Sequence, residues 1–370
     1  MGMRVPYSYL ERQFAHNVDA ILADIRELVR TGDYTLGAAV ADFETRYARQ
    51  LGIRHAIGVD SGTEALTLAL QAVGVKPGDE VITAPNTFIA TVGAIVAAGA
   101  RPVFVDVNAE HNIDPGLVEA AITPRTRALM PVHLSGNPAD MPVLMEIARR
   151  RGIPVVEDAC QAFTAAIDGR FVGAWGDAAG FSLHPLKPLN VWGDGGIIAT
   201  GSDDIAHHLR LRRNHGLSNR DTVEIFGVNS RLDSLQAVVG RHLLDGIMAI
   251  TDRRIANARR LDRGLAPISG SITIPPRRPG VRHVYQTYVV QARDRDDLVR
   301  FLMERGVEAK IHYPVPVHLQ PAAKELGYKP GDFPVCEAQA REIVTLPAHQ
   351  FLADVEIDYV IAQVRDFYTR

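Results

Sequence analysis

Short runs of apolar, often β-branched residues alternate with segments of helical periodicity from residue 55 onward. The runs predicted to be strands are His55–Asp60, Glu80–Ala84, Pro102–Val107, Ala128–Leu134 and Pro154–Asp158. The segments between them that are predicted to be helices are Thr63–Val73, Thr87–Ala98, Leu117–Ile122 and Val143–Arg151. Strands and helices in alternation predict a mainly parallel sheet with helices on both faces, and therefore an α/β domain.

This alternation ends after residue 158. Three further strand-like runs have no long helix between them and are predicted to complete the sheet: Arg170–Gly173, Ala178–Leu183 and Gly196–Thr200. A polar helix is expected over Ile205–Arg213. A long helical pattern then runs from Leu232 to about Leu261, and we expect it to form a spine between two domains.

The last third of the chain predicts a smaller α+β domain. Its pattern is strand, helix, strand, helix, helix, over His283–Ala292, Asp296–Arg305, Glu308–His312, Pro334–Val344 and Val355–Tyr368. The Pro- and Arg-rich stretch of residues 274–282 is expected to be a loop. A chain of 370 residues is too long for one ordinary core, so we expect a large domain over residues 1–245 and a smaller one over residues 246–370.

Composition excludes several classes of protein. Apolar residues make up 46% of the chain, charged residues 22%, and the net charge is -3, so the basic field expected for nucleic-acid binding is missing. Cys160 and Cys336 lie far apart and do not have the spacing of a disulfide framework or a zinc site. No apolar run reaches the roughly 18 residues of a membrane span. Met1–Gln13 also lacks the apolar stretch of a signal peptide, and we expect a cytoplasmic protein.

Lys187 is a candidate nucleophile. It lies in the sequence FSLHPLKPLNVWGDGG of residues 181–196, between two predicted strands, where two prolines restrict the backbone. A lysine with apolar neighbours loses its proton more readily and attacks a carbonyl as a free amine. Because a lone lysine is more often a solvated surface group, the pattern by itself leaves both interpretations open.

Asp158 ends a predicted parallel strand, and ligands collect beyond the carboxyl ends of such strands. A carboxylate at this place can keep a pyridine nitrogen protonated, which makes the ring a better electron sink. Gln161, three residues later, can donate a hydrogen bond to a ring hydroxyl. An aspartate that caps the following turn is the simpler structural explanation.

The sequence SGTEAL of residues 61–66 opens a predicted helix directly after a strand. The free amides and the positive dipole end of such a helix bind phosphate, and Gly62 lets a ligand approach the backbone. Ser61 and Glu64 also match a capping box, which needs no ligand. Phe88, at the start of a later helix, can stack on a flat ring, although a core aromatic is the commoner case.

The histidines predict no metal site. His133, His184 and the pair His207-His208 lack the spacing of metal ligands. We expect them to be surface or hydrogen-bonded core side chains.

Five segments in order resemble one protein family. They are SGTEAL, PNTFIAT at residues 85–91, VVEDACQ at 155–161, FSLHPLK with the following GDGG, and GVNSRLDSLQA at 227–237. The family is the DegT/StrS sugar aminotransferases, and the resemblance extends from Asp33 to Pro347. Departures occur beside the lysine, where Pro188-Leu189-Asn190 and Leu183-His184 replace the family's more frequent residues.

The resemblance implies the aspartate-aminotransferase fold, fold-type I of the enzymes that use pyridoxal 5′-phosphate (PLP). It implies that Lys187 holds PLP as a Schiff base, that Asp158 pairs with the pyridine nitrogen and that Gln161 lies near the ring oxygen. It also implies a homodimer with shared active sites. The remaining residues that it assigns to the cofactor are Gly62, Thr63 and Ser182 at the phosphate, Phe88 against the ring, and Asn229 reaching the phosphate from the partner subunit.

The reaction that the resemblance implies has two halves, in amino-sugar biosynthesis. An amino acid, with glutamate expected, leaves its nitrogen on the cofactor as pyridoxamine phosphate (PMP), and a keto-sugar nucleotide then collects it. The segments at residues 187–189, 228–236 and 312–321 look more like those of members that act on 3-keto sugars than on 4-keto sugars. His312, Tyr313 and His318 offer hydrogen-bond donors for the sugar, and Arg231 offers a guanidinium for a diphosphate. A loop merely shaped by its prolines is the alternative at residues 312–316.

Three other functions remain open on the sequence. One is amination of a 4-keto sugar or of a cyclitol ketone. A second is a PMP-dependent sugar dehydrase of the same fold, which carries histidine where this chain has Lys187. The third is a regulatory homologue without catalysis, which the set of Lys187, Asp158 and Gln161 disfavours.

Overall fold

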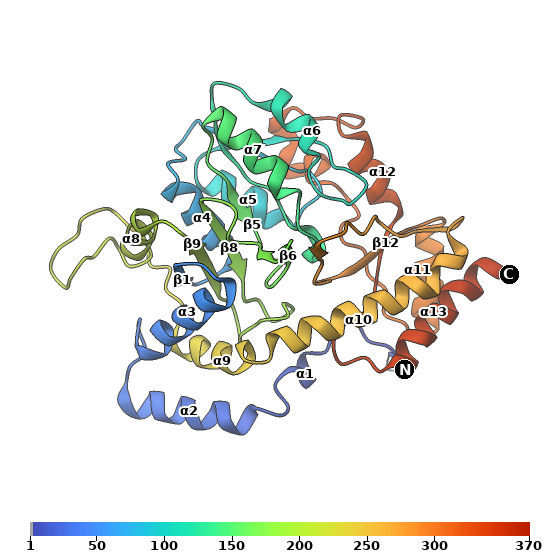
Figure 1. Cartoon of the computed structure of the whole chain (residues 1–370), viewed down its shortest axis with the longest axis horizontal. Helices are drawn as coiled ribbons and strands as arrows, with labels where there is room; N and C mark the ends of the chain where they lie inside the picture. The colour runs from blue at the N-terminus through green and yellow to red at the C-terminus, as the bar shows by residue number, and fades with distance from the viewer. Residues whose placement is uncertain (1–2) are drawn as a thin grey trace.

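A central sheet crosses the larger part of the molecule (Figure 1). The computed structural model describes residues 3–370. One four-stranded sheet has the order β1-β9-β8-β5, and a three-stranded sheet has the order β3-β2-β4. Single parallel bridges between Leu129 and Val155 and between Val132 and Asp158 join the two. The bounds are β1 (His55–Val59), β2 (Glu80–Thr83), β3 (Arg101–Phe104), β4 (Thr126–Leu129), β5 (Val156–Asp158), β8 (Ala178–Ser182) and β9 (Gly196–Thr200).

The sheet is mainly parallel, as the alternating sequence pattern predicts. β2 runs parallel to β3 and β4, and β5 runs parallel to β8. β9 runs antiparallel to both β1 and β8. Since the parallel strands end at one edge, the loops after β5 and β8 lie close together, and this edge carries the site described below.

Helices cover both faces of the sheet, each over its own apolar core. On one face, Leu66, Ile95 and Leu209 pack against Val156 and Ile198. They belong to α4 (Gly62–Ala72), α5 (Ile89–Ala97) and α8 (Asp203–Arg212). On the other face, the core includes Phe43, Tyr47, Phe181, Ile197 and Val238. Its helices are α2 (Val18–Thr31), α3 (Ala38–Leu51) and α9 (Ser234–Leu244), and a further cluster lies under α6 (Pro115–Val118) and α7 (Met141–Arg151).

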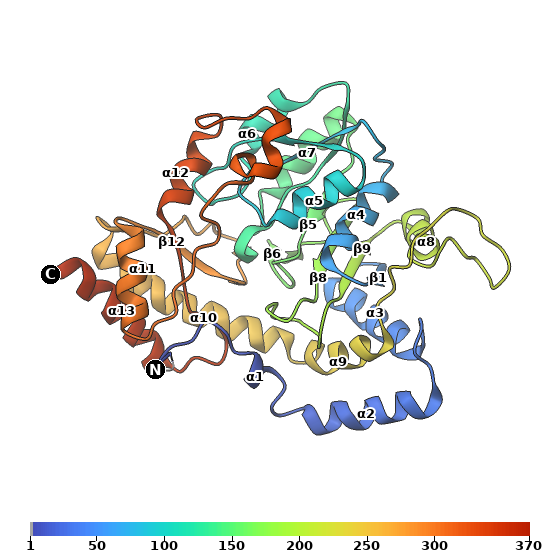
Figure 2. The ribbon, with the colours of Figure 1, turned by 180° about the vertical axis from the view of Figure 1, so that it is seen from behind.

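The C-terminal part forms a smaller α+β unit beside this sheet (Figure 2). Its sheet has the order β10-β12-β13 and is antiparallel. Its core gathers Val5 with residues from 258 to 364, and the predicted division of the chain at residues 245 and 246 stays a prediction. The elements are α10 (Ile247–Leu265), β10 (Ile272–Thr273), β12 (Tyr288–Ala292), α11 (Arg295–Glu304), α12 (Pro334–Glu342), β13 (Ile343–Leu346) and α13 (Asp354–Thr369).

Residues near the start of the chain attach to this smaller unit. Val5 forms a parallel bridge with Val307, and the amide of Tyr7 donates to Oε2 of Glu308 at 2.8 Å. Tyr7 then enters the site, and α1 (Leu10–Gln13) leads to α2. The first segment of the described chain is therefore fixed by residues about three hundred positions later.

Several predictions about elements are wrong. The strand predicted over Glu308–His312 does not form, and only single bridges at Val307 and Lys310 occur there. The pattern over 232–261 is two helices, α9 and α10, because the chain turns at Asp245-Gly246. The predicted helix over 334–344 ends at Glu342, where β13 begins. Residues 170–173 do not complete the main sheet. They form part of a separate small sheet of β6 (Ala166–Ile167), β7 (Arg170–Phe171) and β11 (Val281–Arg282).

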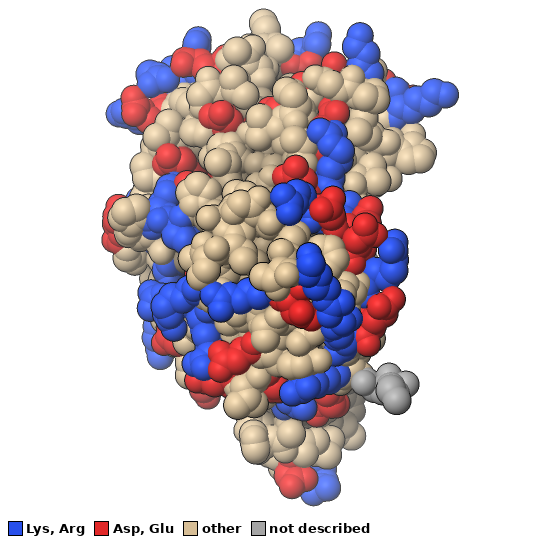
Figure 3. All heavy atoms as spheres, turned by 90° about the vertical axis from the view of Figure 1, so that its right-hand side faces the viewer, with Lys and Arg blue, Asp and Glu red and all other residues tan. Residues whose placement is uncertain are grey.

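Single turns of 3-10 helix and a mixed surface complete the description. The turns are η1 (Glu119–Ala121), η2 (Leu134–Gly136), η3 (Ala266–Ile268), η4 (Val317–Leu319) and η5 (Pro321–Leu326). Basic and acidic side chains are interspersed on the face shown in Figure 3. Within residues 3–370, no helix is both long enough and apolar enough to span a membrane.

Candidate active site

A cavity of about 420 Å³ opens at the carboxyl end of β5. Its walls come from the starts of α4 and α5, the end of β5, the loop after β8, and segments of the smaller unit at residues 286–287 and 312–313. Tyr7 closes one side. Of the residues predicted from the sequence, the cavity brings together Gly62, Thr63, Phe88, Asp158, Gln161, Ser182, Lys187, His312 and Tyr313.

Lys187 lies in the loop between β8 and β9, and hydrogen bonds fix its backbone. Its amide donates to the carbonyl of His184 at 2.8 Å, and its carbonyl accepts from Nδ2 of Asn190 at 2.6 Å. Burial lowers the pKa of the Lys187 amine, and the nearby Cys160 and Asp158 only partly oppose this effect. Its Nζ forms no ion pair with any residue from 3 to 370. The amine is therefore poised to lose its proton inside the cavity.

Asp158 is a buried carboxylate held by neutral donors. Thr91 donates from Oγ1 to Oδ2 at 2.6 Å, and the amide of Cys160 donates to Oδ1 at 3.1 Å. Its carboxylate has no lysine or arginine ion-pair partner in the described part of the chain. A buried carboxylate needs a partner of opposite charge, and a protonated pyridine ring would supply one. The donor set thus fits the cofactor that the sequence predicts.

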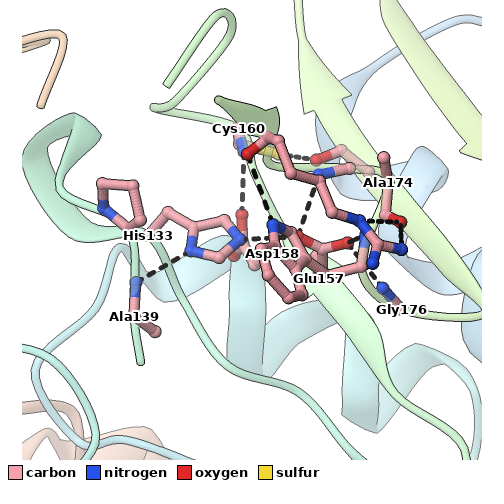
Figure 4. A network of polar contacts seen from close by, with 12 residues as sticks. His133, Ala139, Glu157, Asp158, Cys160, Ala174 and Gly176 are labelled. Carbon is pink, nitrogen blue, oxygen red and sulfur yellow. Dashed lines mark hydrogen bonds and ion pairs between the residues drawn. The ribbon is translucent and has the colours of Figure 1, made fainter. Parts of the chain in front are cut away.

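The residue before Asp158 points to the opposite face of the strand, where it holds β5 in place (Figure 4). Oε1 of Glu157 accepts from the amides of Trp175 and Gly176 at 2.9 and 2.7 Å. Oε2 accepts from the amide of Gly173 at 2.8 Å and from His133 at 3.0 Å. Because Nδ1 of His133 accepts from the amide of Ala139, its proton lies on Nε2 and is donated to Glu157. His133 is thus the hydrogen-bonded core residue expected from the sequence.

The start of α4 offers unpaired amides to the cavity. Ser61 caps the helix, with Oγ accepting from the amide of Glu64 at 3.1 Å. The amides of Gly62 and Thr63 have no hydrogen-bond partner among the described residues. A Cβ at Gly62 would lie 2.6 Å from Cβ of Ser182, so only glycine lets the helix start pack against β8. The cap therefore leaves these two amides, together with the hydroxyls of Ser182 and Thr63, available to bind a phosphate.

Aromatic and imidazole side chains surround the mouth of the cavity. Phe88 is 50% exposed, with its ring centroid 5.9 Å from that of Tyr313. Gln161 accepts from the amide of Ser135 at 2.7 Å and donates to Oη of Tyr313 at 3.4 Å, so it also positions that ring. Burial lowers the pKa of His312 to about 4 and raises the pKa of Tyr313 to about 12. Both side chains are therefore neutral near pH 7.

Three predicted residues lie outside the cavity of this chain. Asn229 is exposed and pairs with Asn214 through a backbone bridge, at the base of the loop that extends from α8 (Figure 1). Arg231 donates to Oδ1 of Asn214 at 2.9 Å. His318 is buried, and its Nε2 lies 3.1 Å from Oε1 of Glu337. It does not line the cavity.

Several lining residues carry no prediction from the sequence. They are Tyr7, Thr87, Thr91, Gln286 and Thr287. Thr87 and Thr91 belong to the PNTFIAT segment, where their spacing of four can be read from the sequence, although α5 begins only at Ile89. Tyr7 and Gln286 have no local signal, because distant segments bring them to the site.

Comparisons with known proteins agree with this geometry. A sequence profile described as the DegT/DnrJ/EryC1/StrS aminotransferase family matches residues 16–365. The chain is 40% identical over 368 residues to a protein of Geobacillus stearothermophilus named pleiotropic regulatory protein, covering 99% of each. It is 42% identical over 368 residues to the dTDP-3-amino-3,4,6-trideoxy-alpha-D-glucose transaminase of Streptomyces venezuelae, covering 99% of this chain and 97% of that one. Its fold matches the crystal structure of S. venezuelae DesV in complex with a ketimine intermediate, with a TM-score of 0.97, 40% identity and full coverage of both chains.

Proposed function

Because this chain belongs to the DegT/DnrJ/EryC1/StrS aminotransferase family and is a PLP-dependent sugar aminotransferase, we propose that it transfers an amino group from glutamate to the C3 ketone of a nucleotide-linked sugar. The observation that carries the proposal is the cavity itself. It faces Lys187 and Asp158 toward one space and places the unpaired amides of α4 at its edge.

PLP, when bound, supplies an electron sink for the carbon that bears the transferred nitrogen. We assign its ring nitrogen to Asp158, whose carboxylate keeps a proton on that nitrogen. The amides of Gly62 and Thr63 and the hydroxyl of Ser182 hold its phosphate. Lys187 carries the cofactor and, once its amine is free, takes a proton from the reacting carbon and returns it. The lowered pKa of Lys187 favours this role, because only the neutral amine accepts a proton.

The choice of a C3 ketone rests on two supports. One is the segments at residues 187–189, 228–236 and 312–321, which resemble those of 3-keto members. The other is the relative from S. venezuelae, whose name specifies a 3-amino sugar. His312 and Tyr313 line the cavity as neutral hydrogen-bonding groups, which suits sugar hydroxyls. His318 and Arg231 do not line the cavity, so it gives no support to a direct contact of either side chain with the acceptor.

The acceptor is tested by direct competition. Turnover is measured with 15N-labelled glutamate and a matched pair of 3-keto and 4-keto nucleotide sugars, with a cyclitol ketone as a third acceptor. We expect the label in the 3-amino sugar with the higher kcat/KM. The Lys187→Ala enzyme is the blank for non-enzymatic imine formation. Activity on the 4-keto sugar or the cyclitol, with none on the 3-keto sugar, contradicts the choice of acceptor.

We further propose a homodimer in which Asn229 of each chain reaches the phosphate site of the other. Asn229 is exposed at the base of a loop that also carries Phe226, which is 94% exposed. An apolar ring so exposed is typical of a surface that another chain covers.

A purely regulatory role, suggested by the name of the relative from G. stearothermophilus, is disfavoured by the same cavity. A binding protein would not need an amine of lowered pKa beside a buried carboxylate. Addition of glutamate to the PLP-loaded protein should convert the absorbance of bound PLP to that of PMP. A spectrum that does not change with glutamate or any other amino acid contradicts catalysis.

A further inference from the structure

Two buried threonines stand in a row behind the carboxylate of Asp158. Thr91 is 1% exposed, lies in the first turn of α5 and donates from Oγ1 to Oδ2 of Asp158 at 2.6 Å. Thr87 is 3% exposed and lies four residues earlier, just before the N-cap of α5, with its Oγ1 2.6 Å from Oγ1 of Thr91. Both line the cavity, while Phe88 between them is turned toward solvent. The same short segment therefore supplies an aromatic ring at the mouth and a polar row at the base.

The direction of these hydrogen bonds follows from the charge on Asp158. An ionised carboxylate only accepts, so Thr91 must use its single hydroxyl proton on Oδ2. Oγ1 of Thr91 is then an acceptor toward Thr87, and Thr87 must be the donor. The row runs from Thr87 through Thr91 to Asp158, and each O–H polarises the next.

The hydrogen bond from Thr91 is the shorter of the two that Asp158 accepts. The other donor to the carboxylate, the amide of Cys160, lies at 3.1 Å from Oδ1, against 2.6 Å for Thr91 at Oδ2. The titratable groups that face the carboxylate are Lys187 and Cys160 from their loops and Tyr313 from the smaller unit. Glu157 points to the other face of β5 and has its own donors. Two donors on different oxygens stop the carboxylate from rotating.

We propose that Thr91 is a positioning residue that holds the Asp158 carboxylate in its orientation toward the cavity, with Thr87 as the donor that orients Thr91. A hydrogen bond donated to a carboxylate favours its charged form, and a buried one restrains its direction. The proposal rests on the proposed function, in which Asp158 pairs with the ring nitrogen of PLP. If so, the pairing between Asp158 and the ring nitrogen depends on Thr91 of α5 as well as on the position of Asp158 at the end of β5.

The test uses four variants of the PLP-loaded enzyme. Thr91→Val removes the hydroxyl and nearly keeps the shape, Thr91→Ser keeps the hydroxyl, and Thr87→Val removes the outer donor. Thr83→Val is the matched control, because Thr83 is fully buried on β2 and its hydroxyl has no partner among the described residues. The measurements are kcat and KM for glutamate, the dissociation constant of PLP, and the pH titration of the absorbance of bound PLP.

We expect Thr91→Val to lower kcat about tenfold to a hundredfold, the effect of one hydrogen bond to a charged group, with KM for glutamate changed less than about twofold. The pH titration of the absorbance of bound PLP should differ from that of the wild-type enzyme, because the Asp158 carboxylate loses its hydrogen-bond donor at Oδ2. Thr91→Ser should restore most of both. Thr87→Val should have a smaller effect, about twofold to tenfold, and Thr83→Val none.

Three results would overturn the proposal. The first is a Thr91→Val enzyme with the wild-type rate and titration while Asp158→Asn is inactive, which leaves the proposed function intact. The second is equal damage from Thr91→Val and Thr91→Ser, which assigns the effect to shape. The third is an unshifted titration in Thr87→Val, which also decides the matter if Thr91→Val does not fold. An active Asp158→Asn enzyme instead refutes the role given to Asp158 in the proposed function.

Discussion

Lys187 differs from an ordinary surface lysine in the partial burial of its side chain and in its lack of an ion-pair partner within residues 3–370. We expect Lys187→Ala to lose the absorbance of the PLP Schiff base, and turnover to fall by at least the factor of about 10²–10⁴ that acid–base catalysis contributes. The variant is compared with Lys76→Ala, which changes an exposed lysine. Borohydride reduction followed by peptide mapping identifies the lysine that holds PLP. A label on any other lysine contradicts the assignment.

The pH at which the Lys187 amine reacts follows from the same surroundings. Burial lowers its pKa below the ordinary value of 10.5, so the neutral amine is present at lower pH than in a free lysine. The rate at which the cofactor-free protein binds PLP covalently should therefore rise with pH, with a midpoint below 10.5. The measurement is stopped-flow absorbance across a pH series. A midpoint at or above that of N-acetyl-lysine amide would contradict a desolvated amine.

At this scale the sequence predicts the residues that belong to continuous motifs. The cavity contains four residues that lie in or just after predicted strands: Gly62, Asp158, Ser182 and Lys187. Tyr7 was not predicted, because it enters the site through contacts with residue 308, and local pattern carries no information about such a distant partner. The role of Thr91 depends on a distance to another element, which composition and spacing do not give.

β5 is a short strand whose position depends on the side chain of Glu157. All four groups around its carboxylate are donors: His133 and the amides of Gly173, Trp175 and Gly176. In Glu157→Gln, the new amide nitrogen faces donors in either orientation. We expect the free energy of unfolding to fall by about 3 kcal/mol, as for a buried charged network that loses a partner. The measurement is the urea midpoint together with the m value.

A matched variant separates this network from the general loss of a carboxylate. Glu146→Gln removes an exposed carboxylate that pairs with Arg150 one turn away on α7, and should change stability by no more than about 0.5 kcal/mol. If both variants unfold at the wild-type urea concentration, the buried network does not stabilise β5.

The elements were predicted best where apolar periodicity is continuous. Most strands from His55 to Asp158 and most helices between them lie within a few residues of their predicted bounds. The exceptions are the predicted helix Leu117–Ile122, most of which is the 3-10 turn η1, and the predicted strand Ala128–Leu134, which ends at Leu129. The errors occur where one or two residues change the path of the chain. Gly246 separates α9 from α10 without interrupting the apolar pattern, and the turn after Glu342 changes a helix to a strand within one residue. The sequence pattern at residues 170–173 also does not show that β7 lies at the edge of a small separate sheet and not in the main sheet.

The proposed homodimer predicts that two inactive chains restore one another. If each site combines Lys187 of one chain with Asn229 of the other, a mixed dimer of Lys187→Ala and Asn229→Trp chains contains one intact site. Equal mixing should recover about a quarter of the wild-type activity, since half the dimers are mixed and each has one working site. The measurement is activity after subunits are separated and reassembled. No recovery, with exchange shown by differently tagged chains, contradicts a shared site.

The attachment of residues 5–9 to the smaller unit also limits how early during synthesis of the chain the cavity can be complete. Tyr7 forms one wall, but its amide is held by Glu308, which lies 301 positions later in the chain. At a synthesis rate of about 5–20 residues per second, Tyr7 leaves the ribosome roughly 15 to 60 seconds before that partner exists. During this interval the α/β domain can fold, yet the side of the cavity that Tyr7 closes stays open. We therefore expect tight binding of the cofactor only late in synthesis, after Glu308 has been added and can hold the amide of Tyr7.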